Sequence, residues 1–246
     1  TFEYNNAMAA WRAGISAEII WADVENGIMV SKAINGIETM TPNLFTSREG
    51  SPARAGLALA KLHNSGETFD FHFDLFNMID DYLNILSSKN AELPEGYHDI
   101  VEAAKPVKEA LVANPMPLAP SHCDPLCENF LDDGNNMWIV DWEYSGMNDP
   151  MWDLGDLSVE AGMDENQENE MLIAYFGKDP TAAQKGRVII YKAMCDLLWT
   201  LWGLIQHADK NPAEDFWAYS IERFERCKKL MQNTDFKKNI QAIGNN

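Results

Sequence analysis

The stretch Ser121–Asp156 reads SHCDPLCENFLDDGNNMWIVDWEYSGMNDPMWDLGD, and the rest of the chain is interpreted from it. Its first part, residues 122–129, has the form H-x-D-x-x-x-x-N. Two short apolar runs follow, and the polar cluster at residues 132–136 separates them. Apolar runs on either side of a Gly- and Asn-rich turn are typical of a β-hairpin.

The predicted hairpin would bring three polar side chains to one place. Asp124 and Asn129 lie on the loop that enters its first strand, and Asp141 follows the end of the second strand. Phosphoryl transfer uses such a set: an Asp accepts the proton of the substrate hydroxyl, while an Asn and a second Asp hold Mg²⁺ against the nucleotide phosphates. Protein kinases carry H-R-D-x-x-x-x-N and then D-F-G. Because this loop lacks the Arg and its later triplet is D-W-E, the pattern favours a small-molecule kinase.

This block resembles the choline/ethanolamine kinase family, and within it the bacterial-type choline kinases. The most specific string is D-W-E-Y-S-G-M-N-D-P at residues 141–150, followed by W-D-L-G-D at residues 152–156. The related aminoglycoside phosphotransferases share H-x-D-x-x-x-x-N but usually lack D-W-E-Y-S-G. The resemblance implies an α+β, protein-kinase-like fold with a mostly helical C-terminal lobe. It also implies an enzyme that uses ATP and Mg²⁺ to phosphorylate the hydroxyl of choline, giving phosphocholine for phospholipid metabolism.

The beginning of the chain corresponds to only part of a kinase nucleotide-binding lobe. Such lobes begin with a Gly-rich loop, then a strand Lys that pairs with the phosphates, and then a helix Glu. The sequence has no such loop and no Lys before Glu3. We therefore expect a truncated N-terminal lobe at residues 1–35 and a catalytic, substrate-binding lobe at residues 36–246. By resemblance Glu3 is the partner of the absent Lys; a plain first-turn Glu favoured by the helix dipole is an equally good interpretation.

The resemblance also assigns roles around the hairpin. Asp124 would orient and deprotonate the choline hydroxyl. Asn129 and Asp141 would hold Mg²⁺, with Glu143 near the metal or its waters. His122 would bond to the backbone near Asp141 rather than move protons.

A pair of tryptophans suggests how the substrate is recognised. Trp199 and Trp202 are three residues apart in an apolar run that is expected to be helical, so they share one helix face. The pair resembles the W-x-x-W of the family, which walls the quaternary ammonium group, and aromatic faces do attract such cations. Glu160 matches the pocket acid of the family and Tyr144 its pocket tyrosine. A bare W-x-x-W is more often core packing, and the aromatic residues at 216–219 could belong to either.

Two other functions stay open at this stage. The first is a kinase of the same fold that acts on ethanolamine, an aminoglycoside or thiamine; the small aromatic box favours choline over the wide acidic groove that an aminoglycoside needs. The second is a non-catalytic protein that binds a cationic metabolite. The intact catalytic motif argues against it, whereas the absent Gly-rich loop and Lys argue for it in this stretch of chain, whose own activity is left open.

The composition of the chain limits the kinds of partner that we expect it to bind. The chain has 246 residues, of which 46% are hydrophobic, enough for a substantial core in one or two domains. Its net charge of −19 disfavours nucleic acid and anionic membranes as partners. The charge would suit a cationic substrate, but the ordinary surface of a soluble cytosolic protein is the favoured interpretation. The four cysteines form no C-x-x-C pair and are expected to be reduced packing residues. We find no signal peptide and expect no membrane-spanning run. The sequence does not predict the oligomeric state.

Overall fold

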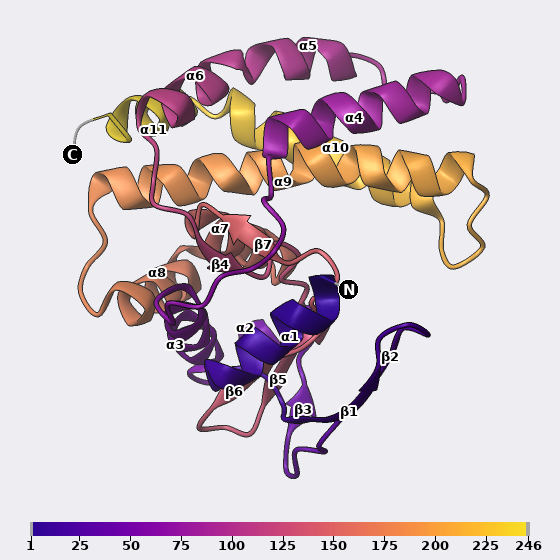
Figure 1. The fold of residues 1–246 in the computed structure, drawn as a ribbon. Helices are drawn as coiled ribbons and strands as arrows, with labels where there is room; N and C mark the ends of the chain where they lie inside the picture. Colours follow the sequence, from indigo (N-terminus) through magenta and orange to yellow (C-terminus); the bar gives the residue numbers. More distant parts are fainter. Residues whose placement is uncertain (1, 245–246) are drawn as a thin grey trace. The chain divides into compact units, whose positions relative to one another are not determined.

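The computed structural model describes residues 2–244, which form a mixed structure of 56% helix and 10% strand (Figure 1). The helices are α1 (Phe2–Arg12), α2 (Pro42–Ser47), α3 (Ser51–His63), α4 (Leu75–Ser88), α5 (Tyr97–Ala103), α6 (Lys105–Ala113), α7 (Met151–Glu160), α8 (Glu165–Phe176), α9 (Ala182–Ala208), α10 (Phe216–Gln232) and α11 (Phe236–Ala242). The strands are β1 (Ile19–Asp23), β2 (Ile28–Ser31), β3 (Glu38–Thr39), β4 (Ala119–Ser121), β5 (Phe130–Asp132), β6 (Met137–Ile139) and β7 (Gly146–Asn148). The α+β composition that the sequence predicted is confirmed.

The chain divides into two compact units. The first contains the residues up to Phe73 together with Met116–Pro180, and the second contains Asp74–Pro115 together with the residues from Thr181 onward. Every strand of the described residues lies in the first unit, and the second unit is helical. The boundary predicted at residue 35 separates a nucleotide-binding lobe from a catalytic lobe, whereas the two units are defined by their internal packing. The predicted boundary therefore stays a prediction.

The predicted hairpin is present in the first unit. Strands β5 and β6 pair antiparallel, with Phe130 opposite Ile139, and β3 adds to the other edge of β5. The turn is fixed by Asp133, whose Oδ1 accepts hydrogen bonds from the backbone N–H groups of Asn135 (2.8 Å) and Asn136 (2.7 Å). An Asp at this place satisfies the turn's own donors, which is why the polar cluster ends one strand and starts the next.

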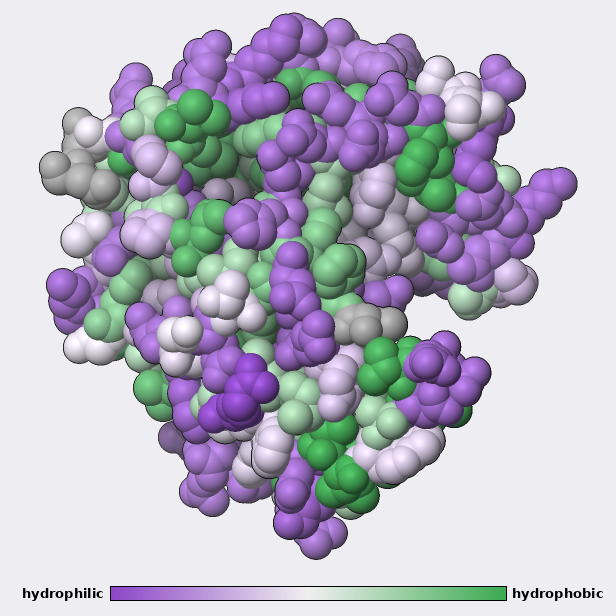
Figure 2. All heavy atoms as spheres, viewed as in Figure 1, coloured by the Kyte–Doolittle hydropathy of each residue, from purple (hydrophilic) through white to green (hydrophobic). Residues whose placement is uncertain are grey.

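The β1–β2 hairpin presents apolar side chains to solvent. The exposed side chains are Ile20, Trp21, Ile28 and Val30, and Figure 2 shows hydrophobic atoms gathered at this hairpin on an otherwise largely hydrophilic face. A sheet of two strands cannot bury its own faces, which accounts for the exposure. Lys32, just after β2, is also exposed and reaches Glu18 at 3.4 Å.

Helices α3 and α8 pack closely at Gly56. A Cβ atom at this position would lie 2.3 Å from the backbone oxygen of Met171, so the approach of the two helices requires glycine. The pair Ser51-Pro52 predicts a helix that is capped by Ser51 and has Pro52 as its first residue, and the observed start of α3 differs from this. Gly50, with a φ of 74°, is the N-cap, and Ser51 is the first helical residue, whose hydroxyl accepts from Arg54 rather than capping the helix.

The aromatic-rich sequence of residues 69–86 predicts a helix over the whole stretch, but α4 begins only at Leu75, where the Asp74 side chain caps it by accepting from the N–H of Asn77 (3.2 Å). The residues before it are extended and pair with β7: the N–H of Met147 donates to the carbonyl of Phe71 at 2.7 Å. The alternation F-x-F-x-F at residues 69–73 is a strand period, and we overlooked it. The sequence of residues 100–113 also predicts a single helix, but the structure has two, α5 and α6, because Pro106 cannot donate a backbone hydrogen bond.

The second unit is built around α9, a helix of 27 residues that opens with a capping box between Thr181 and Gln184. Contrary to our expectation, α9 is long and apolar enough to cross a membrane by length and composition alone. However, 78% of its most apolar window is buried inside the protein, so it is the core helix of this unit. Helices α4, α10 and α11 pack against it, and the hydroxyl of Tyr97 donates to the carbonyl of Leu197 at 2.5 Å. The polar residues 237–246 predict a frayed tail, but in the part that the structure describes helix α11 is held by the buried ring of Phe236.

Candidate active site

Two backbone positions, one in the motif loop and one just past β6, are strained. Cys123 has a φ of 68° and Asp141 a φ of 66°, in the left-handed region that residues other than glycine seldom adopt. Asp141 lies just past β6, as predicted, and the N–H of Val140 donates to the carbonyl of Asn129 at 2.9 Å. Such positions persist only where the surroundings hold them, and they occur often at functional sites.

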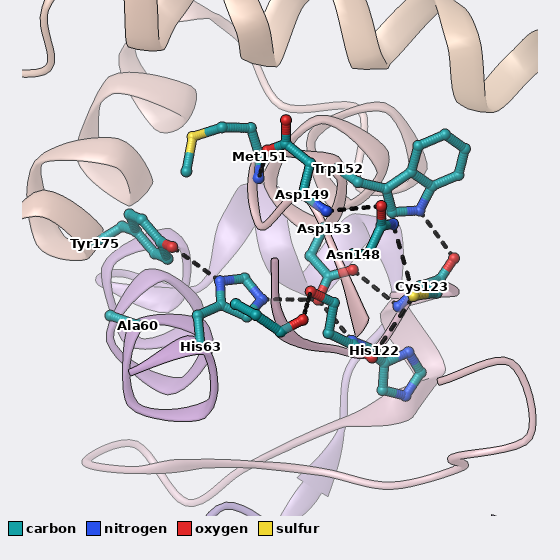
Figure 3. A network of polar contacts seen from close by, with 12 residues as sticks. Ala60, His63, His122, Cys123, Asn148, Asp149, Met151, Trp152, Asp153 and Tyr175 are labelled. Atoms are coloured by element: carbon teal, nitrogen blue, oxygen red, sulfur yellow. Dashed lines mark hydrogen bonds and ion pairs between the residues drawn. The ribbon is translucent and has the colours of Figure 1, made fainter. Parts of the chain in front are cut away.

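Asp153, in the first turn of α7, holds the loop through hydrogen bonds to its backbone (Figure 3). Its carboxylate is fully buried and accepts from the backbone N–H of Cys123 (2.8 Å, on Oδ1) and of His122 (2.7 Å, on Oδ2). The indole N–H of Trp152 donates to the carbonyl of Cys123 at 2.9 Å. Three bonds therefore converge on the two residues that precede Asp124. Bonds from donors to a buried carboxylate are the strong kind, worth about 1.5–3 kcal/mol each.

His63 of α3 completes this support. Its Nε2 lies 3.0 Å from Oδ2 of Asp153, and its Nδ1 lies 2.9 Å from the hydroxyl of Tyr175 on α8 (Figure 3). Because the carboxylate must accept, we assign the proton to Nε2, and the tyrosine hydroxyl then donates to Nδ1. Burial, and then the charges of Asp153 and Asp149, raise the pKa of Tyr175, so that it stays a neutral donor. Because His122 already supplies the histidine of the motif, the sequence favours a structural rather than a catalytic role for His63, and these contacts support that role.

His122 has the structural role that was predicted. Its Nε2 lies 2.9 Å from the carbonyl of Val140, next to Asp141, and its Nδ1 lies 3.3 Å from the backbone nitrogen of Asp124. Its ring packs against Trp142 at a centroid distance of 5.0 Å. Both ring nitrogens are used to join the loop to the end of β6, so this histidine fixes the geometry of the site.

Asn129 is tied to the same loop. Its side chain is buried, and its Nδ2 donates to the backbone carbonyl of Asp124 at 3.1 Å. This bond leaves the amide oxygen as the group that Asn129 can offer to a cation. The Asp124 side chain is half-buried. The structure therefore brings together the two residues of the loop that the sequence selected.

Glu3, Asp141 and Glu143 form a group of carboxylates. Partial burial, followed by the negative charges of Asp141 and Glu143, raises the pKa of Glu3 in the first turn of α1. A divalent cation would relieve such crowding, and carboxylate and amide oxygens are the ligands that Mg²⁺ prefers. Within residues 2–244, His, Cys, Asp and Glu side chains form no metal-binding group of three or more.

Glu160 and Tyr144 lie in the same unit. Glu160 is the last residue of α7 and is half-buried. Burial, then the charges of Glu128 and Glu160, raise the pKa of the Cys127 thiol, which places Glu160 close to the catalytic loop. Tyr144 is half-buried in the turn between β6 and β7. The thiols of this loop are inert packing groups, since burial also raises the pKa of Cys123.

The tryptophan pair lies on α9, in the second unit, and its two members differ. Trp199 is 4% exposed and belongs to the core. Trp202 is half-buried and joins two rings of α10, with centroid distances of 5.6 Å to Phe216 and 5.8 Å to Tyr219. We call Trp202, Phe216 and Tyr219 the aromatic cluster. Gly203 permits it, because a Cβ there would lie 2.6 Å from the Tyr219 ring.

Sequence reasoning missed the support provided by Asp153 and Tyr175. Asp153 was noticed only as part of the W-D-L-G-D string and received no role. One signal was available: an acid at the start of the apolar stretch 151–159, whose residues are all buried, needs partners to be tolerated there. The sequence cannot say which donors it meets, because they come from residues about 30 and 90 positions away.

These features define a class: a kinase-like phosphotransferase with an H-x-D-x-x-x-x-N loop and an acidic strand end. The sequence model of the phosphotransferase enzyme family (APH) matches residues 35–185. The chain is similar to a choline/ethanolamine kinase family protein from Mesorhizobium loti, with 58% identity, a TM-score of 0.96, and coverage of 99% of this chain and 84% of that one.

Two more distant structures agree. Choline kinase LicA from Streptococcus pneumoniae is 27% identical, with a TM-score of 0.79 and coverage of 94% of this chain and 79% of that one. A structure of LicA in complex with AMP is 25% identical, with a TM-score of 0.77 and coverage of 94% and 77%. The chain belongs to the phosphotransferase enzyme family and, within it, to the choline/ethanolamine kinases. It is a kinase-like phosphotransferase with an alcohol acceptor, so the non-catalytic alternative is set aside for the protein.

Proposed function

We propose that this protein transfers the γ-phosphoryl group of ATP to the hydroxyl of choline. The observation that carries the choice of choline is the aromatic cluster of Trp202, Phe216 and Tyr219, whose centroids lie 5.6–6.3 Å apart. A quaternary ammonium group donates no hydrogen bonds, so aromatic faces are its natural partners, each worth about 0.5–2 kcal/mol. The name of the S. pneumoniae relative, a choline kinase, supports the same choice.

Asp124 is the catalytic residue of this proposal. It accepts the hydroxyl proton as the oxygen attacks the γ-phosphorus. The bonds from the His122 and Cys123 backbone to Asp153 keep the loop in one conformation. Holding the base and the hydroxyl in register supplies much of the rate in phosphoryl transfer, where catalysis is mainly positioning and charge stabilisation.

Asn129 and Asp141 would hold Mg²⁺, with Glu143 near the metal or its waters, and the oxygen donors present fit that ion. When bound, the cation neutralises charge on the nucleotide phosphates. Glu3 would pair with a phosphate-binding lysine, and its place beside Asp141 and Glu143 supports a position near the phosphates. The AMP held by a LicA relative supports an adenine nucleotide as the donor.

Tyr144, Glu160 and Trp199 are the remaining substrate-binding residues of the proposal. A carboxylate such as Glu160 would balance the substrate's positive charge, and Tyr144 would add an aromatic face. Trp199 would act by supporting Trp202, since its own ring is buried. We propose a cytoplasmic location, consistent with a substrate pair of ATP and choline and with free, buried cysteines.

Ethanolamine is the second candidate, because the relative from M. loti is named a choline/ethanolamine kinase family protein and a carboxylate suits a primary ammonium. A coupled assay of ADP release with Mg-ATP, offering choline, ethanolamine and one aminoglycoside, decides between them. We expect kcat/KM for choline to exceed that for ethanolamine by about tenfold or more, since each favourable 1.4 kcal/mol gives one factor of ten. A reversed order would assign the protein to ethanolamine, and turnover of the aminoglycoside alone would contradict the proposal.

A further inference from the structure

A buried acid lies between two arginines in the second unit. Asp196 of α9 is fully buried. Arg226 of α10 binds it with two bonds, from Nε (2.7 Å) and Nη2 (2.6 Å), while Nη1 of Arg223 lies 3.4 Å from the same carboxylate. The Arg223 side chain is only 7% exposed, against 35% for Arg226. Of these three charges, two are positive and one is negative.

Arg223 also touches the aromatic cluster. Its guanidinium carbon lies 4.5 Å from the centroid of the Tyr219 ring, and that ring lies 5.8 Å from Trp202. A positive charge therefore sits permanently against a ring that the proposed function gives to a cationic substrate. A cation bound to an aromatic ring lies within about 6 Å of its centroid. A substrate ammonium on Tyr219 would thus lie about 10 Å or less from Arg223, close enough for repulsion in a poorly screened interior.

We propose that Asp196 is a specificity-determining residue, which compensates the charge of Arg223 so that the aromatic cluster can accept a cation. Arg223 keeps Tyr219 in place by packing on its ring, and Asp196, which it shares with Arg226, offsets part of the electrostatic cost of having an arginine there. Asp196 does not touch the substrate; it acts through Arg223. This inference rests on the proposed function, because it assumes that the cluster binds the substrate's ammonium group.

Stability alone is a weak explanation for this arrangement. Buried ion pairs can often be replaced by apolar residues of similar volume without loss of stability. A purely structural role also makes a different prediction: loosening α9 against α10 would weaken every ligand of the cluster alike. Charge compensation predicts that removing the charge of Asp196 weakens only the binding of ligands that carry a positive charge.

The test compares choline with its uncharged carbon isostere, in which a tert-butyl group replaces the trimethylammonium group. In the full chain, Asp196→Asn keeps the shape of the side chain and removes its charge. We expect the choline KM to rise about fifteenfold, the size of a one-charge repulsion at about 10 Å and an effective dielectric of about 20. The inhibition constant of the isostere and kcat should both change by less than about twofold. Glu225→Gln, which removes an exposed charge from α10, the helix of Arg223, is the matched control. It should change neither the choline KM nor the inhibition constant of the isostere.

If Asp196→Asn weakens choline and the isostere equally, the inference is wrong. If that variant does not fold, as judged by circular dichroism, Arg223→Met removes the positive charge instead. The preference for choline over the isostere should then rise, and an unchanged or lower preference would overturn the inference. Failure of the proposed function looks different, because the unmodified protein would then not turn over choline.

Discussion

Replacing Asp153 by Asn tests whether this buried carboxylate fixes the catalytic loop. The change preserves the side chain's shape but turns one accepting oxygen into an N–H donor. In the structure Oδ2 accepts from two groups and Oδ1 from one, the backbone N–H of Cys123. The amide should therefore place its oxygen at the Oδ2 position, leaving its NH₂ facing the N–H of Cys123.

The size of the effect follows from these contacts. One buried donor loses its acceptor, which costs about 1–3 kcal/mol, and the other bonds lose their charge assistance. We expect a loss of about 2–4 kcal/mol in the free energy of unfolding, seen as a fall of roughly 5–15 °C in Tm for a chain of this size. Because the affected residue precedes Asp124, kcat should fall about a hundredfold, while the KM for choline should change little.

Thermal unfolding followed by circular dichroism gives the first quantity, and the ADP-release assay gives the second. Asp209→Asn is the control, since Asp209 is exposed and pairs only with Lys89 among the contacts described; we expect less than about 0.5 kcal/mol from it. A variant of Asp153 with unchanged Tm and unchanged kcat would refute the reasoning.

Three further predictions follow from the structure. Burial and then neighbouring negative charges raise the pKa of Glu3, so its ionised form is disfavoured in the folded state. Glu3→Gln should therefore raise Tm in metal-free buffer near neutral pH. The gain in Tm should vanish as the pH falls below the ordinary pKa of glutamate, and scanning fluorimetry over a range of pH measures both effects. Asn129→Ala should raise the Mg²⁺ concentration for half-maximal turnover about tenfold or more, whereas an unchanged requirement would remove Asn129 from the metal. Gly203→Ala should destabilise the fold by about 1–3 kcal/mol in urea unfolding, because its Cβ would lie 2.4 Å from Oγ of Ser220; a neutral effect would show that α9 and α10 can separate without cost.

Local patterns made much of the site predictable. The hairpin follows from two apolar runs around a polar turn, and this places Asp141 at a strand end. His122, Asp124 and Asn129 follow one another on one short loop, so they must lie close together in space. The contact of His122 with the backbone of Val140 is as expected for this reason.

What the sequence could not provide depends on residues that are distant along the chain. The bonds of Asp153 span 31 residues to His122 and 90 to His63. Likewise, the ion pairs of Asp196 join α9 to α10 across 27 and 30 residues. A buried acid in a helix indicates that hydrogen-bond donors or cations lie beside it, but the sequence does not say which residues these are. The late start of α4 was a different error, since the strand period was present and we gave more weight to the aromatic content.

The division of labour between base and aromatic cluster is tested most directly by measuring choline binding and turnover for two variants side by side. Asp124→Asn should lower kcat by about 10²–10⁴ while calorimetry shows unchanged choline affinity. Trp202→Ala should weaken choline binding by about 0.5–2 kcal/mol, roughly twofold to thirtyfold, with kcat retained. If both variants lost binding and turnover to the same extent, the assignment of separate roles to Asp124 and Trp202 would be contradicted.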